Sequence, residues 1–411
     1  MRSWIRPVVP PVPGHGDLPR VFNTATGQIV ETQPIALAGL YVCGITPYDA
    51  THIGHAATYL AYDTLIRLWL DAGYDVSYLQ NITDIDDPLL ERALAIGADW
   101  RELAASETEL FRRDMSALGV IPPDYFVAVT EVIDDIAVAV DRLLSIGIAY
   151  RLENDIYFDI AAASAASEWH LGQESGYDRE TMLTLSAERG GDPDRPGKRD
   201  PLDPLLWRGR RPGEPYWLSQ VGEGRPGWHI ECSVIAIELL DLPMTVNGGG
   251  IDLAFPHHEF TAAHTASLTG HSHAHAWVHS ALVGYEGEKM SKSLGNLVLV
   301  SSLRAEHEDP RAIRLAILAH HYRSGWEWTA QAMTDARDRL ARWSAWAERR
   351  GTSDALVSEL RSILVHDLDT PAALAAVDAR AEAEDSPPSV IELAIIHSLL
   401  GVDLRPRELG D

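Results

Sequence analysis

Two lysines lie close together in a chain that has almost none elsewhere. Lysine occurs only at Lys198, Lys289 and Lys292, and the last two share a pentapeptide of sequence KMSKS. Arginine binds phosphate as a planar fork, whereas the lysine ammonium group is a mobile point charge that can follow phosphate charge onto a leaving group. Gly287 and Gly295 flank the pentapeptide, which predicts a loop that can close. An ordinary exposed basic loop is the alternative, and a partner motif decides between the two.

A histidine-containing turn upstream supplies that partner motif. Residues 51–55 read THIGH; they follow an apolar run at 36–42 and open a segment in which apolar residues have helical spacing. A strand, a tight turn and a helix N-terminus together favour anionic phosphate, because free backbone N–H groups and the positive end of the helix dipole meet there. Gly54 would let a nucleotide approach the backbone, and His52 and His55 can donate hydrogen bonds to phosphate oxygens.

These two signatures, in this order, resemble those of the class I aminoacyl-tRNA synthetases. Further segments narrow the resemblance to the cysteinyl-tRNA synthetase family, over roughly residues 21–403. They match that family in sequence and order, and they cover 41–46, 81–87, 227–233, 248–253 and 255–259. The resemblance implies an α/β fold, with a class I synthetase-type Rossmann nucleotide-binding core that is split by an insertion and followed by a C-terminal helical bundle.

The resemblance also assigns roles to single residues. ATP would be the nucleotide substrate, with Mg²⁺ assisting, and the catalytic groups that stabilise its departing phosphates would be His52, His55, Lys289 and Lys292. The positions that match the family's pocket for cysteine and cysteinyl-adenylate are Cys43, Gly44, Ile45, Thr46, Gly54, Thr58, Asn81, Ile82, Thr83, Trp228, Gly250, Ile251, Asp252 and Val283. Asp252 could accept from ribose hydroxyls or from the substrate ammonium group, whereas Val283 could equally be a core residue.

The only two cysteines lie where a metal site could form. Cys43 ends the first predicted strand, Cys232 lies near the start of a helical pattern, and His257 begins another. Two thiolates and one imidazole suit Zn²⁺, and three protein ligands leave a fourth tetrahedral position for a substrate. A soft metal would select a substrate thiol over the hydroxyl of serine. Two inert buried thiols are the alternative, which the neighbouring nucleotide signatures make the weaker interpretation.

The predicted metal site departs from the family in one ligand. In the cysteinyl-tRNA synthetases a glutamate four positions after the metal-binding histidine completes the shell, and here that position is Thr261, a poor zinc ligand. We therefore predict one Zn²⁺ per chain held by Cys43, Cys232 and His257, with His258 or Glu259 as weaker candidates for an extra contact.

Other histidines near this segment are interpreted without a metal. The tract formed by His271, His273, His275 and His279 alternates with Ser, Ala and Trp, which is typical of a solvated or partly packed segment. His264 lies seven positions after His257 on the same predicted helix, and we expect it to support or pack beside the site.

A hexapeptide of sequence ERGGDP, at 188–193, indicates which molecule would accept the activated cysteine. It resembles a signature of the branch of this family that joins L-cysteine to an aminosugar-inositol in mycothiol biosynthesis. That resemblance implies an ATP-dependent, AMP-forming carbon–nitrogen ligase. A plain surface loop is the alternative for the hexapeptide itself. For the whole chain, the alternatives are a truncated cysteinyl-tRNA synthetase and a non-catalytic zinc- or nucleotide-binding paralogue.

Charge and composition bear on the partners. Lys plus Arg total 34 against 60 Asp plus Glu, for a net charge of −26, and nucleic-acid binding draws much of its affinity from neutralised phosphates. The basic anticodon-binding module of the synthetases is also missing after the bundle. We therefore expect no tRNA partner. No apolar run is long enough to cross a bilayer, so we expect a cytoplasmic protein without a membrane partner, and a monomer.

The predicted organisation has five parts. They are an irregular N-terminal arm at 1–20, the first half of the catalytic core at 21–120, an inserted connective region at 121–226, the second half of the core with the lysine loop at 227–300, and a helical bundle at 301–411. Predicted strands cover 36–42, 75–82, 244–247 and 277–283, a hairpin covers 149–160, helical patterns cover 87–147, and bundle helices cover 310–320, 330–350, 353–365, 371–383 and 388–400.

Overall fold

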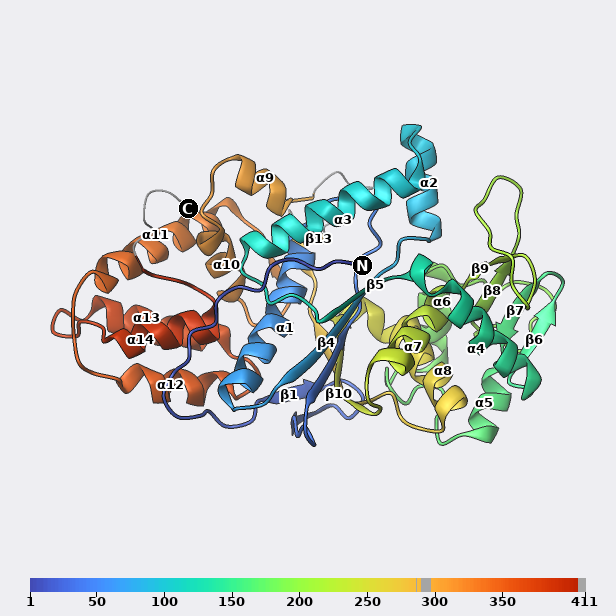
Figure 1. The fold of residues 1–411 in the computed structure, drawn as a ribbon, viewed down its shortest axis with the longest axis horizontal. Helices are drawn as coiled ribbons and strands as arrows, with labels where there is room; N and C mark the ends of the chain where they lie inside the picture. The colour runs from blue at the N-terminus through green and yellow to red at the C-terminus, as the bar shows by residue number, and fades with distance from the viewer. Residues whose placement is uncertain (286, 290–296, 406–411) are drawn as a thin grey trace.

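The computed structural model describes residues 1–285, 287–289 and 297–405, and its centre is a five-stranded parallel sheet (Figure 1). The strands have the order β11-β10-β3-β4-β5, and every neighbouring pair is parallel. Their bounds are β3 Ala38–Val42, β4 Val76–Ile82, β5 Tyr125–Ala128, β10 Met244–Gly250 and β11 Ala274–Ser280. Strands from before and after the inserted region thus share one sheet, which confirms the predicted split α/β core.

The β3-α1-β4 unit forms the nucleotide end of this sheet. Helix α1 spans Ile53–Asp71, and most of its apolar residues are buried, Leu60 and Leu65 fully. Because β3 and β4 are parallel, the chain must cross over through α1, and the helix N-terminus lies beside the carboxyl ends of the strands. The predicted strand, turn and helix are confirmed.

The segment predicted as helical at 87–147 contains a strand as well as helices. Its helices are α2 Asp87–Ile96, α3 Trp100–Ala117 and α4 Ile133–Ser145, with a short 3₁₀ turn η1 at Val129–Glu131. The prediction was wrong at β5, which adds to the sheet beside β4. Pro122 and Pro123 break the helical pattern there, and the aromatic and β-branched residues that follow favour a strand.

The inserted region carries a four-stranded antiparallel sheet, on the right of Figure 1. The predicted hairpin is confirmed as β6 Ala149–Leu152 and β7 Asp155–Phe158. Strands β8 Leu205–Gly209 and β9 Gly224–Pro226 were not predicted, because they are short and lie in a Gly- and Pro-rich stretch. Helices α5 and α6 complete the region, at Ile160–Ala166 and Arg179–Glu188.

The chain returns to the central sheet through α7, which spans Trp228–Leu239. After β10, the 3₁₀ turn η2, the π-helical turn η3 and helix α8 lead to β11, with bounds Ile251–Leu253, Ala254–His258 and Glu259–Thr269. The glycine run at 248–250 is the end of β10 itself. Gly248 must lack a side chain, since a Cβ there would lie 2.3 Å from the ring of Tyr62.

The C-terminal helices pack at the left of Figure 1. All five helical ranges predicted after residue 300 are confirmed, as α10 Pro310–Leu318, α11 Ala330–Ala347, α12 Ala355–Leu364, α13 Thr370–Glu382, and α14 Val390–Ile395 with its π-helical continuation η4 Ile396–Leu400. Short elements complete the described chain: β1 Arg20–Asn23, β2 Gln28–Glu31, β12 Val283–Tyr285, β13 Glu288–Lys289, α9 Val300–Ala305 and β14 Trp326–Glu327. Within the described residues, no helix combines the length and apolarity that crossing a bilayer requires.

A buried ion-pair network joins the bundle to the core. The Asp63 carboxylate on α1 accepts from Arg67 at 2.7 Å and also from Arg314 on α10, and all three side chains are at most 1% exposed. Arg314 donates further to the carbonyl of Leu400 at 2.6 Å. Burial would raise the pKa of Asp63, but the two guanidinium groups hold that pKa below its usual value.

Candidate active site

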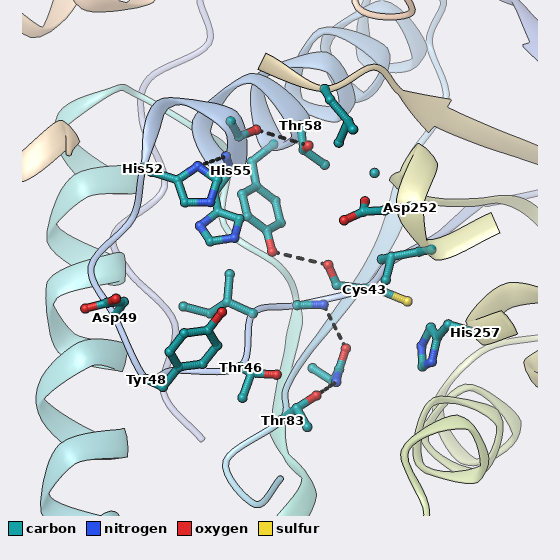
Figure 2. A pocket seen from close by; sticks show the side chains of 18 of the residues that line it. Cys43, Thr46, Tyr48, Asp49, His52, His55, Thr58, Thr83, Asp252 and His257 are labelled. Atoms are coloured by element: carbon teal, nitrogen blue, oxygen red, sulfur yellow. Dashed lines mark hydrogen bonds between the residues drawn. The ribbon is translucent and has the colours of Figure 1, made fainter. Parts of the chain in front are cut away.

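A cavity of about 410 Å³ opens at the carboxyl ends of β3, β4 and β10 (Figure 2). Most residues predicted for the nucleotide and the adenylate line it. These are His52, His55, Cys43, Gly44, Ile45, Thr46, Gly54, Thr58, Asn81, Thr83, Trp228, Gly250, Asp252 and Val283. Ile82 and Ile251 do not line it, because Ile82 is fully buried in the core and Ile251 lies in η2 outside the cavity wall.

The histidine turn is shaped by capping of α1. His52 is the N-cap residue, and its Nδ1 accepts from the backbone N–H of His55 at 3.3 Å. The two imidazole rings stack with their centroids 3.7 Å apart. A Cβ at Gly54 would lie 2.8 Å from Cε1 of His52, so a larger residue here would displace that ring. The turn therefore presents two imidazoles at a helix N-terminus, an arrangement suited to phosphate.

The chain on both sides of the predicted lysine loop is anchored beside this turn. Before the loop, β13 pairs with β12, where Lys289 lies opposite Gly284. After it, the carbonyl of Val298 accepts from the N–H of Ile53 at 2.9 Å, and the N–H of Val300 donates to the carbonyl of Thr51 at 3.0 Å. The described segments that precede and follow the lysine pentapeptide therefore lie near the histidine turn. Lys292 and the Lys289 side chain lie outside the described residues.

The turn after β3 is held by an amide on β4. The Asn81 Oδ1 accepts from the Gly44 N–H at 2.9 Å and from the Tyr41 hydroxyl at 3.0 Å, and its Nδ2 donates to Thr83 at 3.2 Å. A Cβ at Gly44 would lie only 1.5 Å from the carbonyl oxygen of Asn81, so the turn can pass β4 only with glycine at this position. On the facing wall of the cavity, Asp252 points inward (Figure 2).

The predicted metal ligands meet at one end of the cavity. The ligand atoms of Cys43, Cys232 and His257 lie within 4.8 Å of one another, and all three residues are buried. The Cys232 Sγ lies 3.2 Å from Nε2 of His257. Trp228 stacks on the His257 ring at 4.4 Å and so limits its rotation. Zinc bonds of about 2.0–2.3 Å to nitrogen and sulfur fit ligand atoms this close, so the donor set and spacing suit a tetrahedral Zn²⁺.

The two thiols differ in their electrostatics. Burial raises the pKa of Cys43 well above its usual value, and the neighbouring Cys232 adds to the rise. Burial would also raise the pKa of Cys232, but hydrogen bonding to Cys43 and the nearby His257 hold that pKa well below its usual value. One thiolate is therefore favoured without a metal, and a bound divalent cation would favour both.

A chain of polar side chains, buried at His258 and His279, leads from Cys43 to Thr24, and the sequence alone did not reveal it. The Cys43 Sγ lies 3.2 Å from Nε2 of His258, whose Nδ1 lies 2.8 Å from Nε2 of His279, and Nδ1 of His279 lies 2.7 Å from the Thr24 hydroxyl. Burial and the neighbouring histidines hold the pKa of His258 well below its usual value, so this ring is neutral. His258 thus contacts the sulfur of a predicted ligand, Cys43, and is not among the three residues whose ligand atoms cluster.

The structure agrees with two expectations about the histidine segment, a partly packed tract and a packing role for His264. His273 and His279 are buried, at 1% and 6% exposure, whereas His271 and His275 are exposed. The tract is therefore not uniformly solvated, because His273 contacts Thr265 and Asn247 and His279 contacts His258 and Thr24. His264 is buried against Phe158, which agrees with a packing role.

Thr261 and Glu259 face partners other than a metal. The Thr261 hydroxyl donates to the carbonyl of His257 at 2.8 Å. The Glu259 carboxylate accepts from the N–H groups of Gly172 and Ser175, both at 2.9 Å, and so holds a loop of the inserted region. The prediction of Glu259 as an extra metal contact was therefore wrong.

Several residues that line the cavity were not predicted. Tyr48 and Asp49 belong to the turn between β3 and α1, and Tyr59 donates from its hydroxyl to the carbonyl of Cys43 at 3.2 Å. Their position between the predicted strand end and the histidine turn was a usable signal for Tyr48 and Asp49. Tyr59 lies one helical turn beyond His55, where its role follows from the three-dimensional fold alone.

Comparison with known proteins agrees with this geometry. The family model of the tRNA synthetases class I (C) catalytic domain matches residues 30–338. The fold resembles Mycobacterium tuberculosis methionyl-tRNA synthetase in complex with methionyl-adenylate, with a TM-score of 0.59 and 16% identity over 89% of this chain and 88% of that chain. At that identity the likeness describes the fold alone.

Curated relatives are far more similar in sequence. The L-cysteine:1D-myo-inositol 2-amino-2-deoxy-alpha-D-glucopyranoside ligase of Clavibacter michiganensis is 58% identical and covers 98% of this chain and 99% of its own length. The ligases of the same name from Thermobispora bispora and Streptomyces griseus are 57% and 52% identical, and each covers 98% of this chain and 100% of its own length. Such identity over nearly the whole length, on a class I synthetase core, means that the chain belongs to the family of L-cysteine:1D-myo-inositol 2-amino-2-deoxy-alpha-D-glucopyranoside ligases.

Proposed function

We propose that this chain activates L-cysteine with ATP and transfers it to the amine of 1D-myo-inositol 2-amino-2-deoxy-α-D-glucopyranoside, which forms an amide in mycothiol biosynthesis. The observation that carries the proposal is the meeting of Cys43, Cys232 and His257 in the same cavity as the histidine turn. A thiol-selective group and a phosphate-binding turn about one small cavity suit activation of a single amino acid, cysteine.

Cys43, Cys232 and His257 would hold one Zn²⁺ in this proposal. When bound, the ion supplies a soft Lewis acid with an open position for the sulfur of the substrate. Trp228 fixes the His257 ring, and His258 fixes the sulfur of Cys43, so these residues orient the ligands. Serine would be disfavoured, because a neutral hydroxyl is a poor partner for that position.

The first step is an in-line displacement. An oxygen of the cysteine carboxylate forms a bond to the α-phosphorus of ATP while the bond to pyrophosphate breaks, which yields cysteinyl-adenylate. Substrate positioning and charge stabilisation suffice, because the carboxylate is already a nucleophile. His52, His55 and the N-terminus of α1 would bind the phosphates, with Lys289, Lys292 and Mg²⁺ as further cations. Asp252 would bind the ribose or the substrate ammonium group.

The second step is acyl transfer. The neutral amine of the acceptor attacks the carbonyl carbon of the adenylate, a carbon–nitrogen bond forms, and the carbon–oxygen bond to the phosphate of AMP breaks. The products are the amide, AMP and one proton. We propose further that a monomer carries out both steps without tRNA, and that the chain folds in five parts that divide near residues 20, 120, 226 and 300, with β5 as the strand by which residues 121–226 join the core sheet.

Cysteine-dependent exchange of labelled pyrophosphate into ATP tests the first step, and competition between acceptors tests the second. We expect exchange with cysteine and not with serine, followed by amide formation with glucosaminyl-inositol and no aminoacylation of tRNA. Transfer to tRNA without an amide product would select the synthetase alternative. Absence of exchange in zinc-loaded protein would select a non-catalytic role.

A further inference from the structure

A second cavity, of about 780 Å³, adjoins the one that contains the proposed adenylate site. Thr46, Tyr48, Trp228, Asp252 and Leu253 line both cavities, so the two share one wall. The outer walls of the second cavity come from the β4–α2 turn, from the inserted sheet, and from residues 188–192 of the ERGGDP hexapeptide. Its volume lies in the range of small-molecule clefts, about 300–1,000 Å³.

The arginine and lysine side chains that line this second cavity already bind carboxylates or carbonyls of the protein. Arg208 donates to Asp87 at 2.7 Å, Arg211 donates to Asp155 at 2.7 Å, and Lys198 donates to Asp192 at 3.0 Å. The guanidinium groups of Arg195 and Arg225 pair with Asp155 and Asp87 in the same way. Arg189 donates to the main-chain carbonyls of Asp252, at 2.6 Å, and Phe255. The positive charge of the lining is therefore largely neutralised by the protein itself.

Several carboxylates of the lining form no ion pair with a base that the structure describes. Asp86, Glu91 and Glu188 make no ion pair within the part of the chain that the structure describes. Asp86 accepts one hydrogen bond, from the N–H of Asp87 at 2.8 Å. Burial raises the pKa of Asp86 to about 6, so its carboxylate is ionised at neutral pH. The cavity thus presents negative charge that a cationic ligand would neutralise.

Asp86 lies at the end of the second cavity that adjoins the adenylate. Asp86 lines the second cavity together with Tyr48, a residue that lines both cavities. An amine that attacks the adenylate must cross this shared wall. The same lining offers polar groups for hydroxyls; among them, the Nε of the buried Arg225 has no hydrogen-bond partner within the described residues.

We propose that this second cavity is the acceptor subsite, and that it binds a polyhydroxylated amine with Asp86 facing the ammonium group and Glu188 at the rim. This inference rests on the proposed function. It adds where the acceptor binds and which carboxylates recognise its positive charge. A polyanion, such as the 3′ end of a tRNA, would meet uncompensated carboxylates here and is disfavoured.

The Asp86→Asn variant tests this subsite directly. Asn is as good an N-cap residue as Asp, so α2 keeps its start. We expect the KM for glucosaminyl-inositol to rise about 10-fold or more, as for loss of a charge-assisted hydrogen bond. Cysteine-dependent pyrophosphate exchange should stay within about twofold of wild type, because the acceptor takes no part in that step. Glucosyl-inositol, which lacks the amine, should inhibit variant and wild type equally.

Two further variants keep the test decisive. Glu188→Gln, on an exposed side chain, should raise the acceptor KM by a smaller factor, and Glu168→Gln, an exposed glutamate outside the lining, should leave it unchanged. An unchanged acceptor KM in Asp86→Asn, or an equal loss of exchange and transfer, would overturn the subsite while the proposed function stands. Wild-type protein without exchange or amide product would overturn both.

Discussion

Cys43, Cys232 and His257 determine the selectivity that we propose for this enzyme. They come from three separate elements, yet their ligand atoms lie within 4.8 Å of one another. Two of these predicted ligands have a further contact, since the indole of Trp228 stacks on His257 and the ring of His258 contacts Cys43. The selectivity for sulfur therefore depends on a few atoms and is sensitive to single substitutions.

His257→Ala should abolish metal retention and cysteine activation together. Loss of a direct ligand should lower metal affinity by more than the roughly 10–100-fold that is typical when a residue behind a ligand is replaced. Zinc content, measured by mass spectrometry, and pyrophosphate exchange check this expectation. His275→Ala, an exposed histidine on β11, is the matched control and should retain both. Full exchange in His257→Ala would show that this imidazole is not a ligand.

At the scale of elements, the hexapeptide joins the inserted region to the catalytic core. Arg189 donates to two carbonyls of the segment that carries Asp252 and His257. Asp192 accepts from the Tyr157 hydroxyl on β7 at 2.5 Å, and a Cβ at Gly191 would lie 2.2 Å from the Ser186 hydroxyl. The loop is therefore fixed at both ends, which favours a positioning role over that of a plain surface loop.

Arg189→Ala should lower stability by about 1–3 kcal/mol, because two carbonyls lose a charged donor. It should also raise the KM for cysteine, since η2 and η3 lose their tether. Urea unfolding and exchange kinetics measure both effects. Arg179→Ala breaks an exposed ion pair with Asp200 and should cost less than about 1 kcal/mol. Equal effects of the two variants would contradict a tether.

The contact between α8 and the inserted region should make stability depend on pH. Burial, and then the charge of Glu259, raise the pKa of Glu174 to about 8. In the unfolded chain this carboxyl has its ordinary pKa, so between about pH 4.5 and pH 8 the folded state holds a proton that the unfolded state has lost. The free energy of unfolding is therefore unaffected by this group at low pH, and it falls as the pH rises from about 4.5 toward 8.

Glu174→Gln should therefore flatten the decline of unfolding free energy between pH 5 and pH 8, by up to a few kcal/mol at the upper end. Urea titrations at several pH values test this. Glu168→Gln, an exposed glutamate in the same region, should leave the slope unchanged. A slope in Glu174→Gln equal to that of wild type would contradict a raised pKa at Glu174.

Local patterns predicted some elements and missed others for physical reasons. The β3-α1-β4 unit and the bundle helices were predictable, because long periodic apolar runs define them. Strands β5, β8 and β9 were not, since each is short and depends on pairing with distant strands. The metal ligands could be named from residue types, whereas the contacts of His258 and His279 arise only when β11 packs beside η3. The domain boundaries and the role of each site residue stay predictions.

At the scale of the whole molecule, the bundle is fixed to the catalytic core by buried charge. Arg314→Ala removes one of two guanidinium groups from Asp63 and leaves the carbonyl of Leu400 without its donor. We expect a loss of about 3–5 kcal/mol in urea unfolding, as for other broken buried pairs. Arg405→Ala, in an exposed pair with Asp403, should cost less than about 1 kcal/mol. Equal losses of unfolding free energy in the two variants would contradict the claim that the ion pairs of Asp63 hold the bundle to the core.

The central claim is that one Zn²⁺ on Cys43, Cys232 and His257 binds the sulfur of the substrate. X-ray absorption at the zinc edge of the purified protein, with and without L-cysteine, tests it most directly. The account predicts two sulfur ligands and one imidazole before addition, a third sulfur at about 2.3 Å after addition, and no change with L-serine. Protein without zinc, or zinc whose sulfur count stays constant when cysteine binds, would contradict it.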